Sequence, residues 1–227
     1  MGRLIEDKDL RDLRFVFEDR MEAGLRLSES LVNYSGTGTI VFAIPSGGVP
    51  VAAVIARKLR LSLDLLLVRK VRMPGNPESG IGAVGPSGEV ILNTGFIEKL
   101  MISKEAVERE IKLAKETIKK REKLFREARP FPSIEGKTVI VADDGLASGY
   151  TMLTSVEFLR RLKPEKIIAA APTAHEMTVE QIIGEVDELH CLNIRGGYSF
   201  AVADAYKEWY DLTDKEVLDI IKEFSSG

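Results

Sequence analysis

The chain is poor in the residues that build redox, metal and membrane sites. Its 227 residues include one cysteine, Cys191, two histidines and one tryptophan. One cysteine cannot form an internal disulfide, and two distant histidines with one cysteine give no zinc signature. No apolar run approaches the roughly 20 residues of a membrane span, and the charged residues 1–14 lack the hydrophobic stretch of a signal peptide. We therefore expect a cytoplasmic protein that does not enter a membrane.

The chain also lacks an excess of charge of either sign. It has 32 Lys and Arg against 35 Asp and Glu, a net charge of −3. A nucleic-acid surface usually needs a basic excess, so we expect no nucleic-acid partner. Hydrophobic residues make up 44% of the chain, which is enough for a core of normal size. Cys191 lies in the apolar stretch Leu189–Leu192 and is interpreted as a small core residue rather than a reactive thiol.

Predicted strands and helices mostly alternate along the chain. This order indicates an α/β fold, a parallel twisted sheet with helices on both faces. We treat residues 1–227 as one domain, with a helical and hairpin elaboration at about 93–131 and a C-terminal hood at about 193–227. The predicted strands are 39–44, 63–68, 139–142, 166–171 and 187–192, with a hairpin at 80–84 and 89–92. The predicted helices are 13–34, 49–59, 103–129, 152–161, 176–184 and one launched by a capping box of Thr213 and Glu216.

Two of these helices carry a readable apolar face. In the first, Phe17, Met21, Leu25 and Leu31 fall roughly on one side. In the long helix the apolar stripe consists of Val107, Ile111, Ala114, Ile118 and Phe125. The basic run 119–123 on this helix is interpreted as a solvated face in preference to a basic patch.

The strongest chemical signal is the segment Val139–Met152. An apolar run ends in Asp143 and Asp144, and a short loop with Gly145, Ser148, Gly149 and Thr151 leads into a helix. Both acids can reach one ligand only where the strand ends at an open crevice. Backbone amides, two hydroxyls and a helix N-terminus suit a phosphate. A ribose 5-phosphate has the shape that satisfies both halves.

Each part of this segment also has a plainer interpretation. Acid pairs at strand ends occur in receiver domains and metal-dependent phosphatases, hydroxyl residues cap helices, and glycines serve tight turns. A receiver domain is disfavoured because the pair sits late in the chain and no second acid follows a comparable strand. The joint order within nine residues therefore favours a ligand-binding role.

This segment resembles the PRPP-binding motif of the type I phosphoribosyltransferases, in which an apolar run is followed by two acids, three residues, Ser or Thr, Gly, any residue and Ser or Thr. The resemblance extends over most of the chain and is nearest to bacterial and archaeal phosphoribosyltransferase-domain proteins. It implies that Asp143 and Asp144 face the ribose hydroxyls of PRPP. The implied 5-phosphate cradle is Ala147, Ser148, Gly149, Tyr150 and Thr151.

The resemblance also assigns a pyrophosphate end to the site. The turn Ser46-Gly47-Gly48 corresponds to the pyrophosphate loop, where a cis peptide is expected at Pro45-Ser46 or Ser46-Gly47. Relatives usually carry Arg or Lys where this chain has Ser46, which removes one charge-assisted contact. Arg69, Lys70 and Arg72 at the end of a strand could replace it, although a solvated loop is the alternative. Residues 69–78 are predicted to form a loop, and Met73–Ser79 resembles a lid or an ordinary surface loop.

The acceptor end is less readable. His175 follows a strand at the ligand edge and either neighbours a base or merely begins a helix, whereas His190 lies within a strand and is interpreted as structural. The aromatic segment from Tyr198 to Tyr210 forms either a base-covering hood or a cap on the core, and Phe200 is the best stacking candidate.

The implied activity is transfer of the 5-phosphoribosyl group of PRPP to a nitrogen acceptor, a nucleobase or analogue, with release of pyrophosphate. Mg²⁺ would be bound mainly through PRPP, and the protein would take part in nucleotide metabolism. The alternative is a non-catalytic sensor of PRPP or nucleotides on the same fold. A PRPP-forming kinase fits poorly because no ATP-binding segment or tandem second domain is evident. The long helix and the hairpin offer surfaces for a homodimer.

Overall fold

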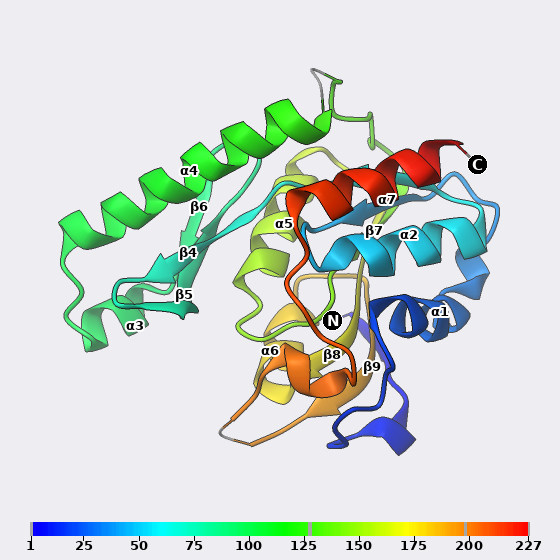
Figure 1. Cartoon of the computed structure of the whole chain (residues 1–227), viewed down its shortest axis with the longest axis horizontal. Helices are drawn as coiled ribbons and strands as arrows, with labels where there is room; N and C mark the ends of the chain where they lie inside the picture. Colours follow the sequence, from blue (N-terminus) through cyan, green and yellow to red (C-terminus); the bar gives the residue numbers. More distant parts are fainter. Residues whose placement is uncertain (1, 127–128, 198, 227) are drawn as a thin grey trace.

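A six-stranded, fully parallel sheet forms the centre of the computed structural model, which describes residues 2–126, 129–197 and 199–226 (Figure 1). For residues 77–79 and 226 it describes the backbone only. The strand order is β1-β9-β8-β7-β2-β3. The strands are β1 (Arg3–Ile5), β2 (Ile40–Ala43), β3 (Ser62–Leu65), β7 (Thr138–Ala142), β8 (Lys166–His175) and β9 (Glu188–Arg195). The predicted α/β fold is confirmed.

Helices cover both faces of this sheet because its strands are apolar on both sides. On one face, Val41 and Ile140 pack with α1 (Arg20–Ser30), α2 (Gly48–Leu59) and α7 (Asp214–Ser226). On the other, Phe42 and Val141 pack with α5 (Tyr150–Arg161) and α6 (Glu176–Ile182). The carboxyl ends of the strands consequently open between two layers of helices, where ligands bind in such folds.

A smaller antiparallel sheet projects from this core (Figure 1). It consists of β4 (Arg69–Met73), β5 (Asn76–Val84) and β6 (Val90–Leu92), followed by α3 (Thr94–Lys99) and α4 (Lys104–Arg126). The hairpin of β5 and β6 and the buried stripe of α4 are confirmed. The prediction of a loop at 69–78 is wrong, because most of these residues belong to β4 and β5, which pair as antiparallel strands. The segment Met73–Ser79, whose sequence resembles a lid, connects these two strands and begins β5.

The first helix is much shorter than the predicted span 13–34. It begins at Arg20, where the Asp19 side chain accepts a hydrogen bond from the Glu22 amide, and it ends at Ser30 before a 3₁₀ turn, η2 (Val32–Tyr34). Met21 and Leu25 are exposed, so the predicted apolar face is wrong as well. The buried face is instead made of small residues and leucine, because α2 packs closely against it: Ala23, Gly24 and Leu27.

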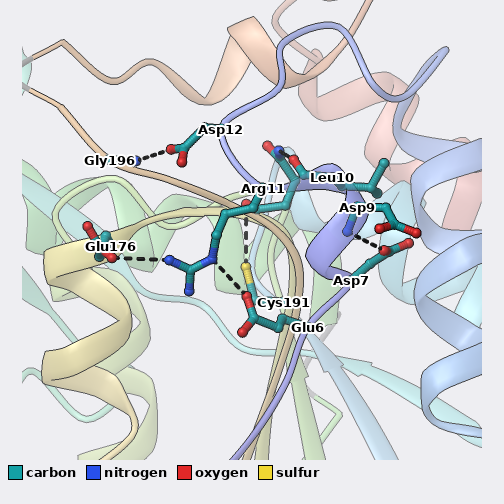
Figure 2. A network of polar contacts seen from close by, with 10 residues as sticks. Glu6, Asp7, Asp9, Leu10, Arg11, Asp12, Glu176, Cys191 and Gly196 are labelled. Atoms are coloured by element: carbon teal, nitrogen blue, oxygen red, sulfur yellow. Dashed lines mark hydrogen bonds and ion pairs between the residues drawn. The ribbon is translucent and has the colours of Figure 1, made fainter.

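The N-terminal segment is structured although its sequence predicts no element there: β1 pairs with β9 and is followed by η1 (Lys8–Leu10). Figure 2 shows Arg11 donating to Glu6 and to Glu176, each at 3.2 Å, and Asp12 accepting from the Gly196 amide at 2.8 Å. These contacts fasten the segment beside β9 and α6. Cys191 beneath it is fully buried, and burial raises the pKa of its thiol, as expected for a core residue.

The C-terminal segment contains one further 3₁₀ turn, η3 (Val202–Ala205), before α7. The predicted capping box at its start is confirmed, since the Glu216 carboxylate accepts from the Thr213 amide at 2.8 Å and the Thr213 hydroxyl accepts from the Glu216 amide. Among the helices in the described ranges, none has the length and apolar character needed to cross a membrane.

Candidate functional site

The two acids and the two glycine-containing turns line one cavity of about 570 Å³ at the carboxyl ends of β2 and β7. Its position follows from sheet register, because Ala43 pairs with Ala142 and the chain leaves both strands at the same level. A larger cavity of about 830 Å³ lies between α4, the β5–β6 turn and α5, but neither acid nor either turn reaches it. The smaller cavity is therefore the candidate site. Predicted site residues that line it are Ser46, Gly47, Arg69, Lys70, Asp143, Asp144, Ala147, Ser148, Gly149, Thr151 and Phe200.

The two aspartates have different surroundings. One oxygen of Asp144, Oδ2, accepts from Arg20 Nε at 2.8 Å, and both side chains of this pair are largely buried, at 14% and 7% exposure. Asp143 Oδ1 accepts from the Asp144 amide at 2.9 Å, and the carboxyl of Asp143 also shares a hydrogen bond with that of Asp144. Among the described contacts Asp143 makes no ion pair, so it is the member of the pair that a ligand can still engage.

These surroundings act on the carboxyl pKa values. Burial, and then the adjacent charge of Asp144, raise the pKa of Asp143 well above its ordinary value. Burial also raises the pKa of Asp144, but the Arg20 guanidinium opposes that rise. Two carboxylates this close disfavour double ionisation unless a cation joins them. The ionisation of Asp143 is consequently the one that a cationic or hydroxyl-bearing ligand would change most.

Arg20 is a site residue that the sequence does not indicate. It is the first residue of α1, and its guanidinium lies 3.8 Å from the centroid of the Trp209 ring. It also donates to the Tyr210 carbonyl at 2.9 Å, while the Tyr206 hydroxyl donates to the Asp144 carbonyl. The C-terminal aromatic segment therefore contacts both Arg20 and the main chain of Asp144, and so helps to hold the acid pair in place. The sequence signal next to Arg20 is the capping residue Asp19, which fixes where α1 begins. Asp144, the partner of Arg20, lies 124 residues away, and no local pattern in the sequence links the two.

The loop after the acids ends in the N-terminus of α5. Gly149 precedes the helix with φ of +74°, and a Cβ there would lie 2.7 Å from Thr178 Cγ2, so both conformation and space require glycine. The Thr178 hydroxyl donates to the Ala147 carbonyl, which orients the loop. Exposed amides and the helix dipole make this a suitable anion site. Of the five residues predicted for the cradle, Tyr150 does not line the cavity.

The turn after β2 packs directly on the acids. The peptide between Pro45 and Ser46 is cis, at one of the two predicted positions. A Cβ on Gly47 would lie 1.8 Å from Asp144 Oδ2. Any residue other than glycine at this position would therefore displace the carboxylate. Gly48 begins α2 behind the turn and does not line the cavity. The close approach of turn to acids gives Gly47 a structural reason beyond turn formation.

The predicted cations divide into two groups. Arg69 and Lys70 on β4 line the cavity, whereas Arg72 is exposed and lies in a neighbouring small pocket. Burial lowers the pKa of the Arg69 guanidinium, and the positive charges of Arg121 and Arg72 lower it further. Mutually repelling cations beside a cavity favour an anionic ligand there.

The two candidates for base binding, Phe200 and His175, contact each other. Phe200 lines the cavity, and the His175 ring stands edge-on to it with 5.5 Å between centroids. His175 itself caps α6 by accepting from the Met177 amide, and its Nε2 lies 2.9 Å from the Gly197 carbonyl. Phe96 of α3, which the sequence does not suggest, also lines the cavity. Tyr198 lies outside the described residues.

His190 occupies the structural position that its strand predicts. It is buried, and its two ring nitrogens lie beside the Ser30 hydroxyl and the Glu188 carboxylate. The histidine does not line the cavity and takes no part in the site.

Within the described ranges, no group of three or more His, Cys, Asp or Glu side chains is placed to hold a metal ion. Asp143 and Asp144 are the carboxylates that line the cavity. This donor set suits a Mg²⁺ ion that takes most of its ligands from a bound phosphate compound and few from the protein.

Comparison with known proteins gives a consistent result. The model of the phosphoribosyl transferase domain family matches residues 19–205. A curated protein of Mycobacterium tuberculosis that bears a provisional phosphoribosyl transferase name is 31% identical over 203 residues, which are 89% of this chain and 46% of that protein. The chain thus spans about half the length of the curated relatives it matches. A ribose-phosphate pyrophosphokinase of Pyrococcus furiosus is 37% identical over 62 residues, 26% of this chain and 22% of that protein.

Among solved structures, the crystal structure of the protein TT1426 from Thermus thermophilus superposes with a TM-score of 0.73 at 33% identity. The alignment covers 93% of this chain and 99% of that chain. The residues that the family model matches include both turns, both acids and the helices that hold them. On its fold and on the family match, the chain belongs to the phosphoribosyl transferase domain family.

Proposed function

We propose that the chain transfers the 5-phosphoribosyl group of PRPP to a nitrogen acceptor and releases pyrophosphate. The observation that carries this proposal is the lining of one cavity, which brings together the acids, the anion-binding loop that follows them, and a second glycine turn with Arg69. A ribose bearing a phosphate at C5 and a pyrophosphate at C1 has anions at both ends and hydroxyls between them. Its three parts match the three parts of the cavity.

In the proposed reaction the acceptor nitrogen forms a bond to C1 as the C1–O bond to pyrophosphate breaks. Positive charge develops on the ribose and negative charge on the departing pyrophosphate, so the task of the protein is electrostatic. In this reaction the Asp143 carboxyl, which lines the cavity, contacts the ribose hydroxyls, and Asp144 remains held by Arg20. Arg69 and Lys70 face the leaving group. The reaction requires no covalent nucleophile from the protein.

Mg²⁺ bound to the pyrophosphate oxygens would neutralise part of their charge. The two aspartates and the ordered turn at residues 45–48 fit that arrangement, because they leave most coordination positions to the substrate. Phe200 and Phe96 are apolar surfaces on which a planar base could stack. We accordingly propose a nucleobase or a close analogue as the acceptor.

The test combines binding and turnover. Calorimetric titration of the chain with PRPP and Mg²⁺ should show binding, and a pyrophosphate-release assay over a panel of purines, pyrimidines and analogues should identify an acceptor. The Asp143→Asn variant is the control for turnover. Failure of PRPP to bind would reject the assignment of the cavity.

A sensor of PRPP or nucleotides is the second candidate. Its support is Ser46, a neutral side chain in the turn that would face the leaving group. A sensor would bind PRPP and release no pyrophosphate with any acceptor, so the two hypotheses separate in the same experiment.

We retain two further expectations as proposals, a cytoplasmic location and a single domain with an elaboration at about 93–131 and a hood at about 193–227. A homodimer through α4 or the hairpin is a third.

A further inference from the structure

Arg121 is a largely buried cation that none of the functions above has used. It belongs to the basic run on α4 whose sequence predicts a solvated helix face, yet its side chain is only 15% exposed. Its Nη2 donates to Ser46 Oγ at 2.9 Å and its Nη1 donates to the Pro45 carbonyl at 3.4 Å. The prediction of a solvated face is therefore wrong for Arg121, because its side chain turns inward toward the turn after β2.

A third contact joins the same nitrogen of Arg121 to the C-terminal helix. Arg121 Nη2 also donates to Asp214 Oδ1, at 2.8 Å, in the first turn of α7. Three segments that are distant in sequence consequently meet at one side chain: the turn at 45–48, the projecting helix α4 and the C-terminal helix α7. Because a guanidinium is planar and presents several donors in a fixed geometry, it can hold two partners in register as a lysine cannot.

The charge of Arg121 is not fully balanced by this contact. Asp214 is 45% exposed, so solvent weakens its pull, and the Arg121 charge still acts on Arg69 at the wall of the cavity. Arg121 does not itself line the cavity. It stands behind the turn, supports it through Ser46 and Pro45, and adds positive potential where Ser46 supplies none.

We propose that Arg121 is a positioning residue for the turn at residues 45–48, through which it determines how tightly the site holds the pyrophosphate group. This proposal rests on the proposed function, since it presumes that the turn faces a pyrophosphate. It assigns to the projecting helix α4 an indirect part in binding the leaving group, through the turn at residues 45–48.

The test measures two partial ligands by calorimetry, so it needs no turnover. Magnesium pyrophosphate probes the turn, and ribose 5-phosphate probes the acids and the loop at 147–151. We expect Arg121→Gln to raise the dissociation constant of pyrophosphate by about tenfold or more, as loss of charge-assisted contacts typically does, and to leave that of ribose 5-phosphate unchanged. Arg121→Lys, which keeps the charge and loses the fork, should fall between the wild type and Arg121→Gln.

The matched control is Lys120→Gln, which removes the same charge from the adjacent, exposed position of α4. It should bind both ligands as the wild type does. Equal weakening by Lys120→Gln and Arg121→Gln would reduce Arg121 to general electrostatics and overturn the proposal. So would equal loss of both ligands in Arg121→Gln, which would indicate a merely structural role, or a wild type that does not bind pyrophosphate.

The outcome is separable from the fate of the proposed function. A chain that binds pyrophosphate through Arg121 but transfers no phosphoribosyl group would retain this inference and lose the transferase. If the chain turns over PRPP but Arg121→Gln binds pyrophosphate normally, the transferase proposal stands and the inference about Arg121 is rejected.

Discussion

Arg20 and Asp144 form a buried ion pair, with 2.8 Å between Nε and Oδ2, that gives two adjacent aspartates different roles. Asp144 is held by an ion pair with the protein, while its neighbour Asp143 makes no ion pair among the described contacts. A site with two identical residues in sequence is thus asymmetric in structure. This asymmetry determines how variants of the two acids should differ.

Replacing Asp143 by Asn should lower pyrophosphate release by about 10²-fold or more, the usual effect of losing charge stabilisation in a transition state. The fold should not suffer, because the side-chain oxygen of the introduced asparagine can accept the same hydrogen bond from the Asp144 amide. The assay is steady-state release of pyrophosphate with a thermal melt of the same sample. Unchanged turnover would refute the role given to Asp143.

Replacing Asp144 by Asn should instead appear in stability. It leaves the Arg20 guanidinium buried without its carboxylate, which typically costs about 3–5 kcal/mol. Denaturant unfolding of the two Asn variants, side by side, gives the comparison. If both variants unfold at the denaturant concentration of the wild type, the Arg20–Asp144 pair does not act as described.

The raised pKa of Asp143 predicts a pH dependence of stability. The folded chain keeps this proton at pH values where the unfolded chain, with an ordinary carboxyl pKa of about 3.9, has released it. At pH values between the pKa of the unfolded carboxyl and the raised pKa of folded Asp143, the native state binds more protons than the unfolded state. The free energy of unfolding should therefore fall as pH rises from about 4 through the pKa of Asp143. Melting temperatures across this range should show that decline in the wild type and a flatter profile in Asp143→Asn. Identical profiles would mean that Asp143 titrates normally.

Replacing Gly47 by Ala tests the close approach of the turn to the acids. The added Cβ would overlap Asp144 Oδ2, so either the carboxylate or the turn must shift, at a cost of about 1–3 kcal/mol typical of overpacking. PRPP binding should weaken markedly. Gly38→Ala is the matched control, since a Cβ there meets no atom within 4 Å. Equal behaviour of the two variants would contradict the packing of Gly47 on the acids.

Replacing Phe200 by Leu tests the acceptor end. Loss of ring stacking typically costs about 1–3 kcal/mol per base, so the KM for the acceptor should rise while the affinity for PRPP stays constant. The measurement is a KM for each substrate in the variant and the wild type. A change confined to PRPP would move Phe200 from the acceptor end to the donor end of the cavity.

The parts of the molecule that could be predicted from sequence are those with local causes. The segment 139–152 carries its own strand, acids, glycines and helix start, and the stripe of α4 repeats at helical spacing. The contacts of Arg20 and Arg121 could not be predicted, because their partners lie 124 and 75 residues away. Strand β4 could not be predicted either, since its polar residues become a strand only when β5 pairs with them.

The first helix carries a local signal that its apolar spacing obscures. Asp19 caps the helix by accepting from the Glu22 amide, and this cap starts the helix at Arg20 instead of the predicted Leu13. Phe17 is buried through a bridge to Tyr206 and not through a helical face. An apolar residue that contacts a distant segment can therefore imitate a helical period.

The pairing of Ala43 with Ala142 has a consequence for selectivity. Main-chain hydrogen bonds between neighbouring strands fix the span from the turn after β2 to the acids after β7, whatever side chains surround them. In the proposed function this span fits the donor sugar, whereas Phe96 and Phe200, which line the acceptor end, lie outside these two strands. Substitutions at Phe96 and Phe200 could therefore change the preferred acceptor without altering the distance between the turn after β2 and the acids.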